Sequence, residues 1–68
     1  MSPIEKAYEE LPISIKNTAE LYPEGRNILI RCLCREARRT EAEVKFWLIS
    51  NKIKVKNIED YIIKDDSD

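Results

Sequence analysis

Histidine and glutamine are missing from this sequence, and glycine occurs only once. Without histidine, the chain lacks the side chain that most often acts as a general acid or base near neutral pH and that activates a catalytic cysteine. A single glycine cannot build the glycine-rich loop that cradles phosphate groups. The carboxylates show no spacing that suggests a catalytic pair. We therefore expect a protein that is not an enzyme, needs no cofactor and has no small-molecule substrate.

Cysteine is also scarce, because only Cys32 and Cys34 are present. Two cysteines without histidine cannot complete a tetrahedral zinc shell from one chain, so we expect no metal site. The two residues lie two positions apart in a segment with helical periodicity, which points their side chains about 200° from each other and prevents a bridge within the chain. Two interpretations remain open: both are small core residues, or one of them links two chains.

Long hydrophobic runs are absent as well. The longest apolar stretch without a charge, residues 46–49, is far too short to span a bilayer, so no membrane partner is expected. The N-terminal residues Met-Ser-Pro-Ile-Glu lack the basic and then apolar layout of a secretory signal, which favours a cytoplasmic location. The 37% of charged residues and the abundance of Ile, Glu, Lys and Arg are typical of proteins from thermophiles.

The 68 residues suffice for one domain, whose single core gives only marginal stability unless a partner covers part of its surface. Residues 2–5, Ser-Pro-Ile-Glu, predict a helix start in which Ser2 is the cap and Glu5 completes a capping box. Pro12 ends this helix, because proline lacks an amide hydrogen and disfavours helix in the residue before it. A first helix that ends before Pro12 is therefore expected, with Ile4, Ala7, Tyr8 and Leu11 toward the core.

The next segment, residues 13–22, is ambiguous. Ile13 and Ile15 alternate as in a strand, whereas the later apolar residues suit a short helix capped near Ser14 or Asn17. We favour the helix. Residues 23–25, Pro-Glu-Gly, then mark a turn or another helix start.

The most hydrophobic helix candidate follows, and we expect it to be central and buried. Thr40 and Glu43 form a second capping box, so a last helix begins after a break of two or three residues. That helix carries the only tryptophan, Trp47, which we expect in the core. The apolar positions of the central helix are Ile28, Leu29, Ile30, Cys32, Leu33, Cys34 and Ala37.

The stretch from residue 30 to residue 49 resembles a helix-turn-helix unit. In that family a small residue lets the two helices approach, a position filled here by Cys34, and apolar residues such as Val44 lock the pair. The turn departs from the family pattern, because it holds Arg38 and Arg39 where a glycine and an aliphatic residue are usual. The resemblance covers about twenty residues and implies a domain that binds double-stranded DNA, as a chromatin-associated or transcriptional regulator.

The C-terminal part has two alternative structures. Ile53 and Val55 alternate with lysines as in a half-buried strand, and residues 57–63 fit either a capped helix or a returning strand. A hairpin there would make the whole resemble a winged helix. The sequence thus predicts an all-α domain over residues 1–64, with four or five helices and possibly this C-terminal β-hairpin wing, followed by a disordered acidic tail at 65–68.

Charge is unevenly distributed along the chain. Residues 1–25 hold two Lys against five Glu, and residues 57–68 hold one Lys against one Glu and four Asp, whereas residues 26–56 hold nine basic residues against three Glu. A local basic face is the footprint of phosphate-backbone binding. The residues predicted to contact double-stranded DNA are Arg31, Arg35, Arg38, Arg39, Thr40, Lys45, Lys52, Lys54 and Lys56.

Two observations keep other functions open. Glu41 and Glu43 lie in the first turn of the expected recognition helix, where they stabilise the helix dipole but repel a phosphate. Phe46 and Ile49 lie beside the core-facing positions of the same helix and could form an apolar docking patch. The alternative to DNA binding is therefore an accessory subunit of a larger replication or transcription complex, which uses Phe46 and Ile49 as its protein interface. The protein partner could also be a second copy, in a homodimer.

Overall fold

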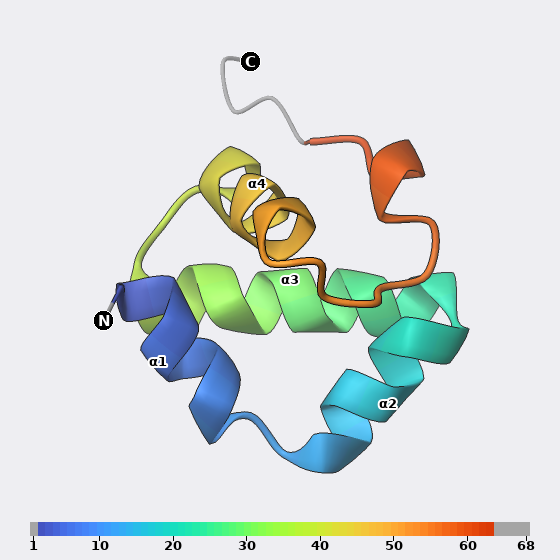
Figure 1. Ribbon diagram of the computed structural model, residues 1–68, viewed down its shortest axis with the longest axis horizontal. Helices are drawn as coiled ribbons and strands as arrows, with labels where there is room; N and C mark the ends of the chain where they lie inside the picture. The colour runs from blue at the N-terminus through green and yellow to red at the C-terminus, as the bar shows by residue number, and fades with distance from the viewer. Residues whose placement is uncertain (1, 64–68) are drawn as a thin grey trace.

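The computed structural model describes residues 2–63, which form four α-helices and one short 3-10 helix and contain no strand. The all-helical prediction is confirmed. Figure 1 shows α3 running through the middle of the molecule, with α1 and α2 on one side of it and α4 on the other. The elements are α1 (Pro3–Glu10), α2 (Ile13–Leu21), α3 (Pro23–Ala37), α4 (Glu41–Ser50) and η1 (Ile58–Asp60).

Helix α1 begins and ends where its local sequence dictates. Ser2 Oγ accepts a hydrogen bond from the Glu5 amide at 3.0 Å, which is half of the expected capping box, and Pro3 occupies the first turn. The helix ends at Glu10, because the following Leu11 and Pro12 are extended. Ile4 and Ala7 face the core.

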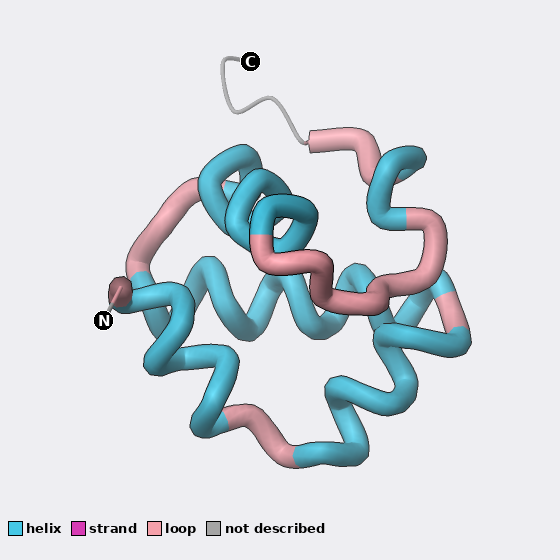
Figure 2. Tube along the Cα trace, in the orientation of Figure 1, coloured by secondary structure: helices cyan, strands magenta, loops and turns pink. Residues whose placement is uncertain are grey.

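Helix α2 confirms the helical alternative for residues 13–22, but the caps expected at Ser14 or Asn17 are wrong. The helix already begins at Ile13, with Pro12 in the N-cap position and no side chain bonded to the exposed amides. The fixed φ of Pro12 starts this helix without help from a capping side chain. Figure 2 shows how short the connections on either side of α2 are.

Tyr22 is the single residue between α2 and α3, so these two helices pack closely. Gly25 makes this possible: a Cβ at that position would overlap the backbone carbonyl of Thr18. Pro23 starts α3 at its first position. Of the two alternatives for residues 23–25, the helix start is therefore confirmed.

Helix α3 supplies the centre of the core. Leu29, Ile30 and Leu33 are fully buried, and they pack with residues from the other three helices. Cys32 and Cys34 are half-buried free thiols, and Cys34 packs against the core as expected. The buried residues are Ile4, Ala7, Ala19, Leu29, Ile30, Leu33, Ala37, Val44 and Leu48.

The segment after α4 forms neither the predicted capped α-helix nor a hairpin. Within residues 53–63 the chain is extended, makes the single 3-10 turn η1, and becomes extended again. Instead of pairing with a second strand, the amide of Lys56 donates to the Ala19 carbonyl at the end of α2, at 2.8 Å. No wing is present in the part of the chain described, and the acidic tail expected at 65–68 lies outside it. Among the described helices, none has the length and apolar character needed to cross a membrane.

Candidate functional site

The junction between α3 and α4 is a tight turn of three residues, Arg38 to Thr40. Arg38 adopts the left-handed conformation, with φ 55° and ψ 49°, and the amides of Arg38 and Arg39 both donate to the Cys34 carbonyl. The bond from Arg39 is the 6→1 bond of the Schellman motif and the bond from Arg38 is the 5→1 bond of the αL motif, two helix ends that glycine usually closes. Arg38 thus takes up a backbone geometry that glycine adopts most easily.

Thr40 then begins α4 with the predicted capping box. Its hydroxyl accepts from the Glu43 amide at 3.2 Å, and the Glu43 carboxylate accepts from the Thr40 amide, also at 3.2 Å. These reciprocal bonds satisfy two amides at the start of the helix. Figure 1 shows the result: α3 lies across the view while α4 is seen nearly end-on, so the two helices cross steeply.

The inner face of α4 locks it to the core. Val44 and Leu48 are fully buried, and the half-buried Trp47 packs against Tyr8 with ring centroids 5.6 Å apart. Trp47 thus packs against the core as expected, but it is not one of the fully buried residues. The contact with Tyr8 also fixes α1 beside α4.

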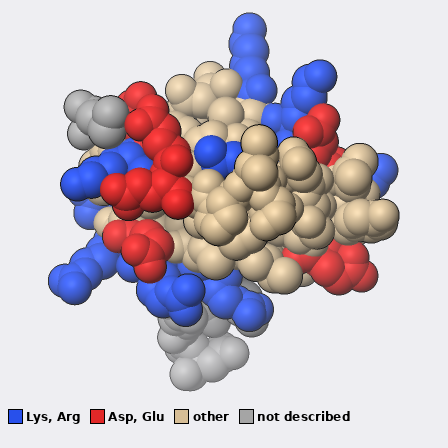
Figure 3. All heavy atoms as spheres, turned by 90° about the horizontal axis from the view of Figure 1, so that it is seen from below, with Lys and Arg blue, Asp and Glu red and all other residues tan. Residues whose placement is uncertain are grey.

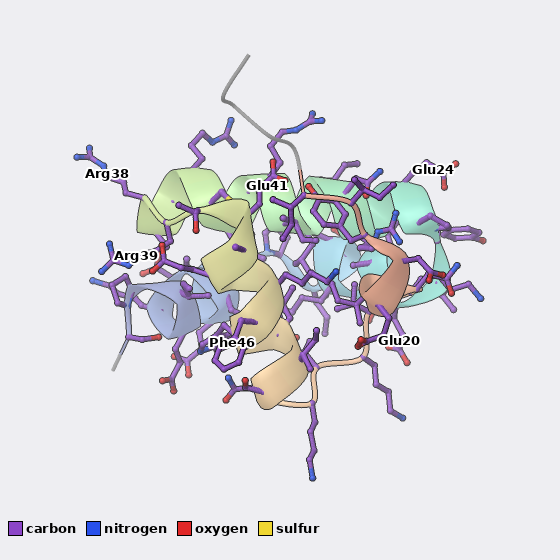
Figure 4. All side chains as sticks on the ribbon, turned by 90° about the horizontal axis from the view of Figure 1, so that it is seen from above. Glu20, Glu24, Arg38, Arg39, Glu41 and Phe46 are labelled. Carbon is purple, nitrogen blue, oxygen red and sulfur yellow. The ribbon has the colours of Figure 1, made fainter. Side chains whose placement is uncertain are left out.

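The outer face of α4 is mostly apolar and faces solvent. Ala42, Phe46 and Ile49 follow one another at helical spacing, and we call them the α4 stripe. Phe46 is 72% exposed and Ile49 39% exposed. Figure 4 looks onto α4 from outside, with Phe46 along its middle. The two residues predicted as a protein interface therefore lie on one surface.

Four of the predicted cations bracket this stripe. Arg38 and Arg39 precede α4, as Figure 4 shows, and Lys52 and Lys54 follow it; all four are exposed. Arg39 Nε lies 3.9 Å from a Glu43 carboxylate oxygen, an exposed pair that neutralises charge but adds little stability. The surroundings of the stripe carry a net positive charge.

The other predicted cations lie elsewhere or have other contacts. Lys45, the only basic residue on α4, donates through Nζ to the Tyr61 carbonyl at 2.9 Å and is half-buried. Arg35 lies 4.0 Å from Glu36 on α3. Arg31 lines a polar hollow between α3, the start of α4 and the C-terminal segment. Lys56 belongs to the segment that is bonded to α2. The nine residues therefore do not form one continuous basic face. Seen from below, Figure 3 likewise shows Lys and Arg at several separate places around the rim.

The polar hollow has a volume of about 310 Å³ and is built around Tyr61. Tyr61 donates through its hydroxyl to Glu41 at 2.8 Å, and the Arg26 guanidinium lies 5.4 Å from the centre of its ring. Arg26 also donates to the Asn57 carbonyl at 2.7 Å. These contacts hold the C-terminal segment against α3 and α4, which gives both Arg26 and Tyr61 a structural role.

Burial raises the pKa of Tyr61 to about 12, with further contributions from its hydrogen bond to Glu41 and from the negative charge of that carboxylate. Burial, and then the charge of Glu41, also raises the pKa of the Cys34 thiol. A raised pKa leaves Cys34 in the thiol form, which is the unreactive one. This chemistry agrees with the core interpretation of Cys34.

Sequence reasoning missed the contacts between Arg26, Tyr61 and Glu41. The sequence holds no local signal for them, because residues 26 and 61 are distant in the chain and meet only after the C-terminal segment has folded back. No group of three or more metal-ligating side chains gathers anywhere within residues 2–63. Of the residues predicted to bind DNA or protein, Arg38, Arg39, Phe46, Ile49, Lys52 and Lys54 are therefore exposed along α4 and at its two ends.

Comparisons of the chain with models of protein families, with curated proteins and with solved structures give no match in any of the three.

Proposed function

We propose that this domain is a protein-docking module that binds an acidic, amphipathic helix of a partner across the outer face of α4. The observation that carries the proposal is the exposed α4 stripe, Ala42, Phe46 and Ile49, with unburied cations at both ends. Apolar contact provides the binding energy of such an interface, and the flanking charges select and orient the partner.

The shape of the surface suits a helix. Ala42 is small and stands one turn before the large Phe46, so a partner helix can approach closely at one end and place its side chains around the ring at the other. Helix α4 has ten residues and is therefore about 15 Å long. A partner segment of about three turns would cover it.

The charge arrangement suits an acidic partner. Arg38 lies before α4 and Lys52 after it, and neither forms an ion pair within the described residues. Carboxylates near the two ends of a partner helix would meet these cations while its apolar residues meet the stripe. The only carboxylate among the exposed residues of α4, Glu43, is already balanced by Arg39.

A designed peptide tests this function. The probe is an 18-residue fluorescein-labelled helix of Glu, Ala and Leu with its Leu residues on one face, and the control peptide has the same composition with Leu spread around the helix. We expect Phe46→Asp to weaken binding of the probe by roughly tenfold or more, since it places an unpaired charge in an apolar contact. Phe46→Ala should show part of this loss without adding charge.

Ile13→Asp is the matched control, because Ile13 is 73% exposed and lies on α2, away from α4. It should leave probe binding unchanged, with circular dichroism showing that all variants are folded. Equal binding of the probe and the control peptide would refute the proposed function. So would equal losses in the Ile13 and Phe46 variants.

The second candidate function is binding of double-stranded DNA by a helix-turn-helix. One observation favours it: α4 follows α3 after a three-residue turn, crosses it steeply, and has exposed cations at both ends, where phosphates flank a recognition helix in the major groove. It ranks second because the only basic residue of α4, Lys45, is bonded to Tyr61, and because Glu43 occupies the first turn.

A salt titration with a 20-base-pair duplex separates the two functions. If the duplex is the partner, Arg38→Ala and Lys52→Ala should each reduce the slope of log affinity against log salt by about 0.9, and Arg35→Ala should serve as the control. Binding of the duplex that survives Phe46→Asp but is lost in the Arg38 and Lys52 variants would replace the docking function by the DNA function. Failure to bind the duplex at low salt would eliminate the DNA function.

A further inference from the structure

A second exposed apolar surface lies on the other side of the molecule, along α2. Ile13, Leu21, Tyr22 and Ile28 are all exposed there, with Ile13 at 73% and Leu21 at 62%. Because α1 and α2 lie on one side of α3 and α4 on the other, this surface is separate from the α4 stripe (Figure 1). It belongs to no function proposed above.

The middle of this surface contains no charged side chain, although 37% of the residues in the chain are charged. Helical spacing places five uncharged exposed residues of α2 next to one another, while Lys16 and the exposed Glu20 lie at their edge, beside Ile13. Figure 3, which views the molecule from below, shows a broad uncharged area where α2 lies. The five residues are Ile13, Ser14, Asn17, Thr18 and Leu21, which together with Tyr22 and Ile28 we call the α2 face.

The α2 face has a hollow as well as projections. The hollow has a volume of about 130 Å³ and lies between α2 and α3, where it is lined by Ser14, Ile15, Thr18, Gly25 and Ile28. Three of its lining residues, Ser14, Thr18 and Gly25, are small, and Gly25 brings the two helices together. A mostly apolar cavity of this order accepts a small hydrophobic group, so one aliphatic side chain fits it.

We propose that the α2 face binds a second copy of this chain in a two-fold symmetric dimer. In such a dimer the same surface serves both partners, so each copy must present both the projection and the hollow that receives it. The α2 face does so, with the exposed Ile13 and Leu21 as projections and the hollow lined by Ser14, Thr18 and Gly25. The middle of the face also lacks charge, so apolar side chains of the two copies meet there, while the exposed Glu20 and Glu24 lie at its edges.

The size of the domain agrees with this arrangement. The core holds only nine buried hydrophobic residues, whereas four large apolar side chains are left exposed on the α2 face. Burying these side chains against a second copy adds apolar contact that a domain this small cannot make internally. The α4 stripe, which is flanked by like charges, would repel its own copy and lacks this self-complementarity.

The molar mass of the full chain in solution tests the proposal, measured by sedimentation equilibrium from low micromolar to millimolar concentration. We expect the mass to rise from one 8.0 kDa chain to two and no further. Ile13→Asp should raise the dimer dissociation constant by roughly tenfold or more, because it places an unpaired charge in an apolar interface. An acidic residue in the first turn of α2 is compatible with the helix dipole, so the monomer should stay folded.

Leu21→Lys is the second variant, because a cation at the last residue of α2 also suits the dipole. Phe46→Asp is the matched control: its side chain is 72% exposed, and it should leave the dimer intact. A chain that stays monomeric at millimolar concentration overturns the proposal, as does a mass that rises beyond two chains or an equal loss of the dimer in the Phe46 variant. The α4 variants are read out by peptide binding and the α2 variants by the molar mass in solution. Each experiment can therefore refute its own proposal without affecting the other.

Discussion

Arg38 holds the backbone conformation that glycine adopts most easily. Its φ of 55° lies in the left-handed region, where a Cβ costs about 1 kcal/mol or more relative to glycine. We therefore expect Arg38→Gly to stabilise the fold by about 1 kcal/mol, measured as the free energy of unfolding in urea. Arg38→Asn should give a smaller gain, since Asn tolerates this region better than Arg.

Arg39→Gly is the control for that substitution, because Arg39 has no positive φ. It should destabilise the protein slightly through the greater backbone freedom of glycine in the unfolded chain. If Arg38→Gly and Arg39→Gly changed stability equally, the loss of one positive charge would explain both, and the backbone explanation would be wrong.

Ionisation of Tyr61 should lower the free energy of unfolding at alkaline pH. Its pKa is raised to about 12 in the fold, mainly by burial, against about 10 in an unfolded chain. A group whose pKa is raised by folding contributes stability below the unfolded pKa and loses it as the pH rises through the folded one. The contribution of Tyr61 is thus complete below about pH 10 and disappears toward pH 12.

Urea unfolding of the native chain and of Tyr61→Phe at pH 9 and pH 11 measures this effect. The native chain should lose more stability between the two pH values than the variant, which has no hydroxyl to ionise. Tyr8→Phe serves for comparison, because burial also raises the pKa of Tyr8, which lies away from Glu41. Equal losses in the native chain and in Tyr61→Phe would assign the pH dependence to other groups.

Among the elements, η1 and the segments around it pack against the core and are also held by hydrogen bonds from side chains of α3 and α4. Lys45 on α4 donates to the Tyr61 carbonyl, and Arg26 on α3 donates to the Asn57 carbonyl. Lys45→Met keeps the aliphatic part of the side chain and removes the charged donor. Loss of the hydrogen bond to Tyr61 should cost about 1.5 kcal/mol of stability. We expect amide hydrogen exchange in residues 58–63 to become about tenfold faster, with little change in α3.

Lys54→Met is the matched control for this prediction. Lys54 is exposed and forms no hydrogen bond within the described residues, so its loss should leave exchange in residues 58–63 unchanged. Faster exchange in both variants would show that net charge, and not the bond to Tyr61, holds the segment.

The elements also show which parts of the fold the sequence can predict. Ser2 and Thr40 cap helices through bonds to amides three residues away, so their motifs are complete within one turn and were recognised. The start of α2 was misplaced, because Pro12 begins that helix by its fixed φ and leaves no capping motif to recognise. Local signals predict an element well when its ends are fixed by neighbouring residues.

The structure predicted for the C-terminal segment was wrong because contacts with distant residues, and not neighbouring residues, fix this segment. Ile53 and Val55 do turn toward the core in alternation, as a half-buried strand would, but no strand lies beside them in the part of the chain described. The amide of Lys56 pairs instead with Ala19, 37 positions earlier, and a contact at that distance leaves no periodic trace in the sequence. The same limit concealed the structural role of Arg26 and Tyr61.

At the scale of the whole molecule, charge along the chain predicted the candidate site only in part. The excess of cations between residues 26 and 56 is real, yet folding distributes those cations over several surfaces, and only Arg38, Arg39, Lys52 and Lys54 bracket the α4 stripe. Lys45 lies on α4 as expected, but its charge is engaged by a backbone carbonyl. Helical periodicity located the exposed Phe46 and Ile49, because it separates the two faces of a helix.

The bond between Lys56 and Ala19 also has a consequence for the order of events in folding. The principal contacts among α1, α2, α3 and α4 join helices that are neighbours or next neighbours in the chain, and short connections let such contacts form early. The C-terminal segment must instead close a loop of 16 residues for its bond to Lys45 and loops of more than thirty residues for its bonds to Ala19 and Arg26, and the entropy lost in closing these loops opposes its early folding. Residues 53–63 should therefore be the last part of the described chain to reach their place, and the first to leave it when the protein unfolds.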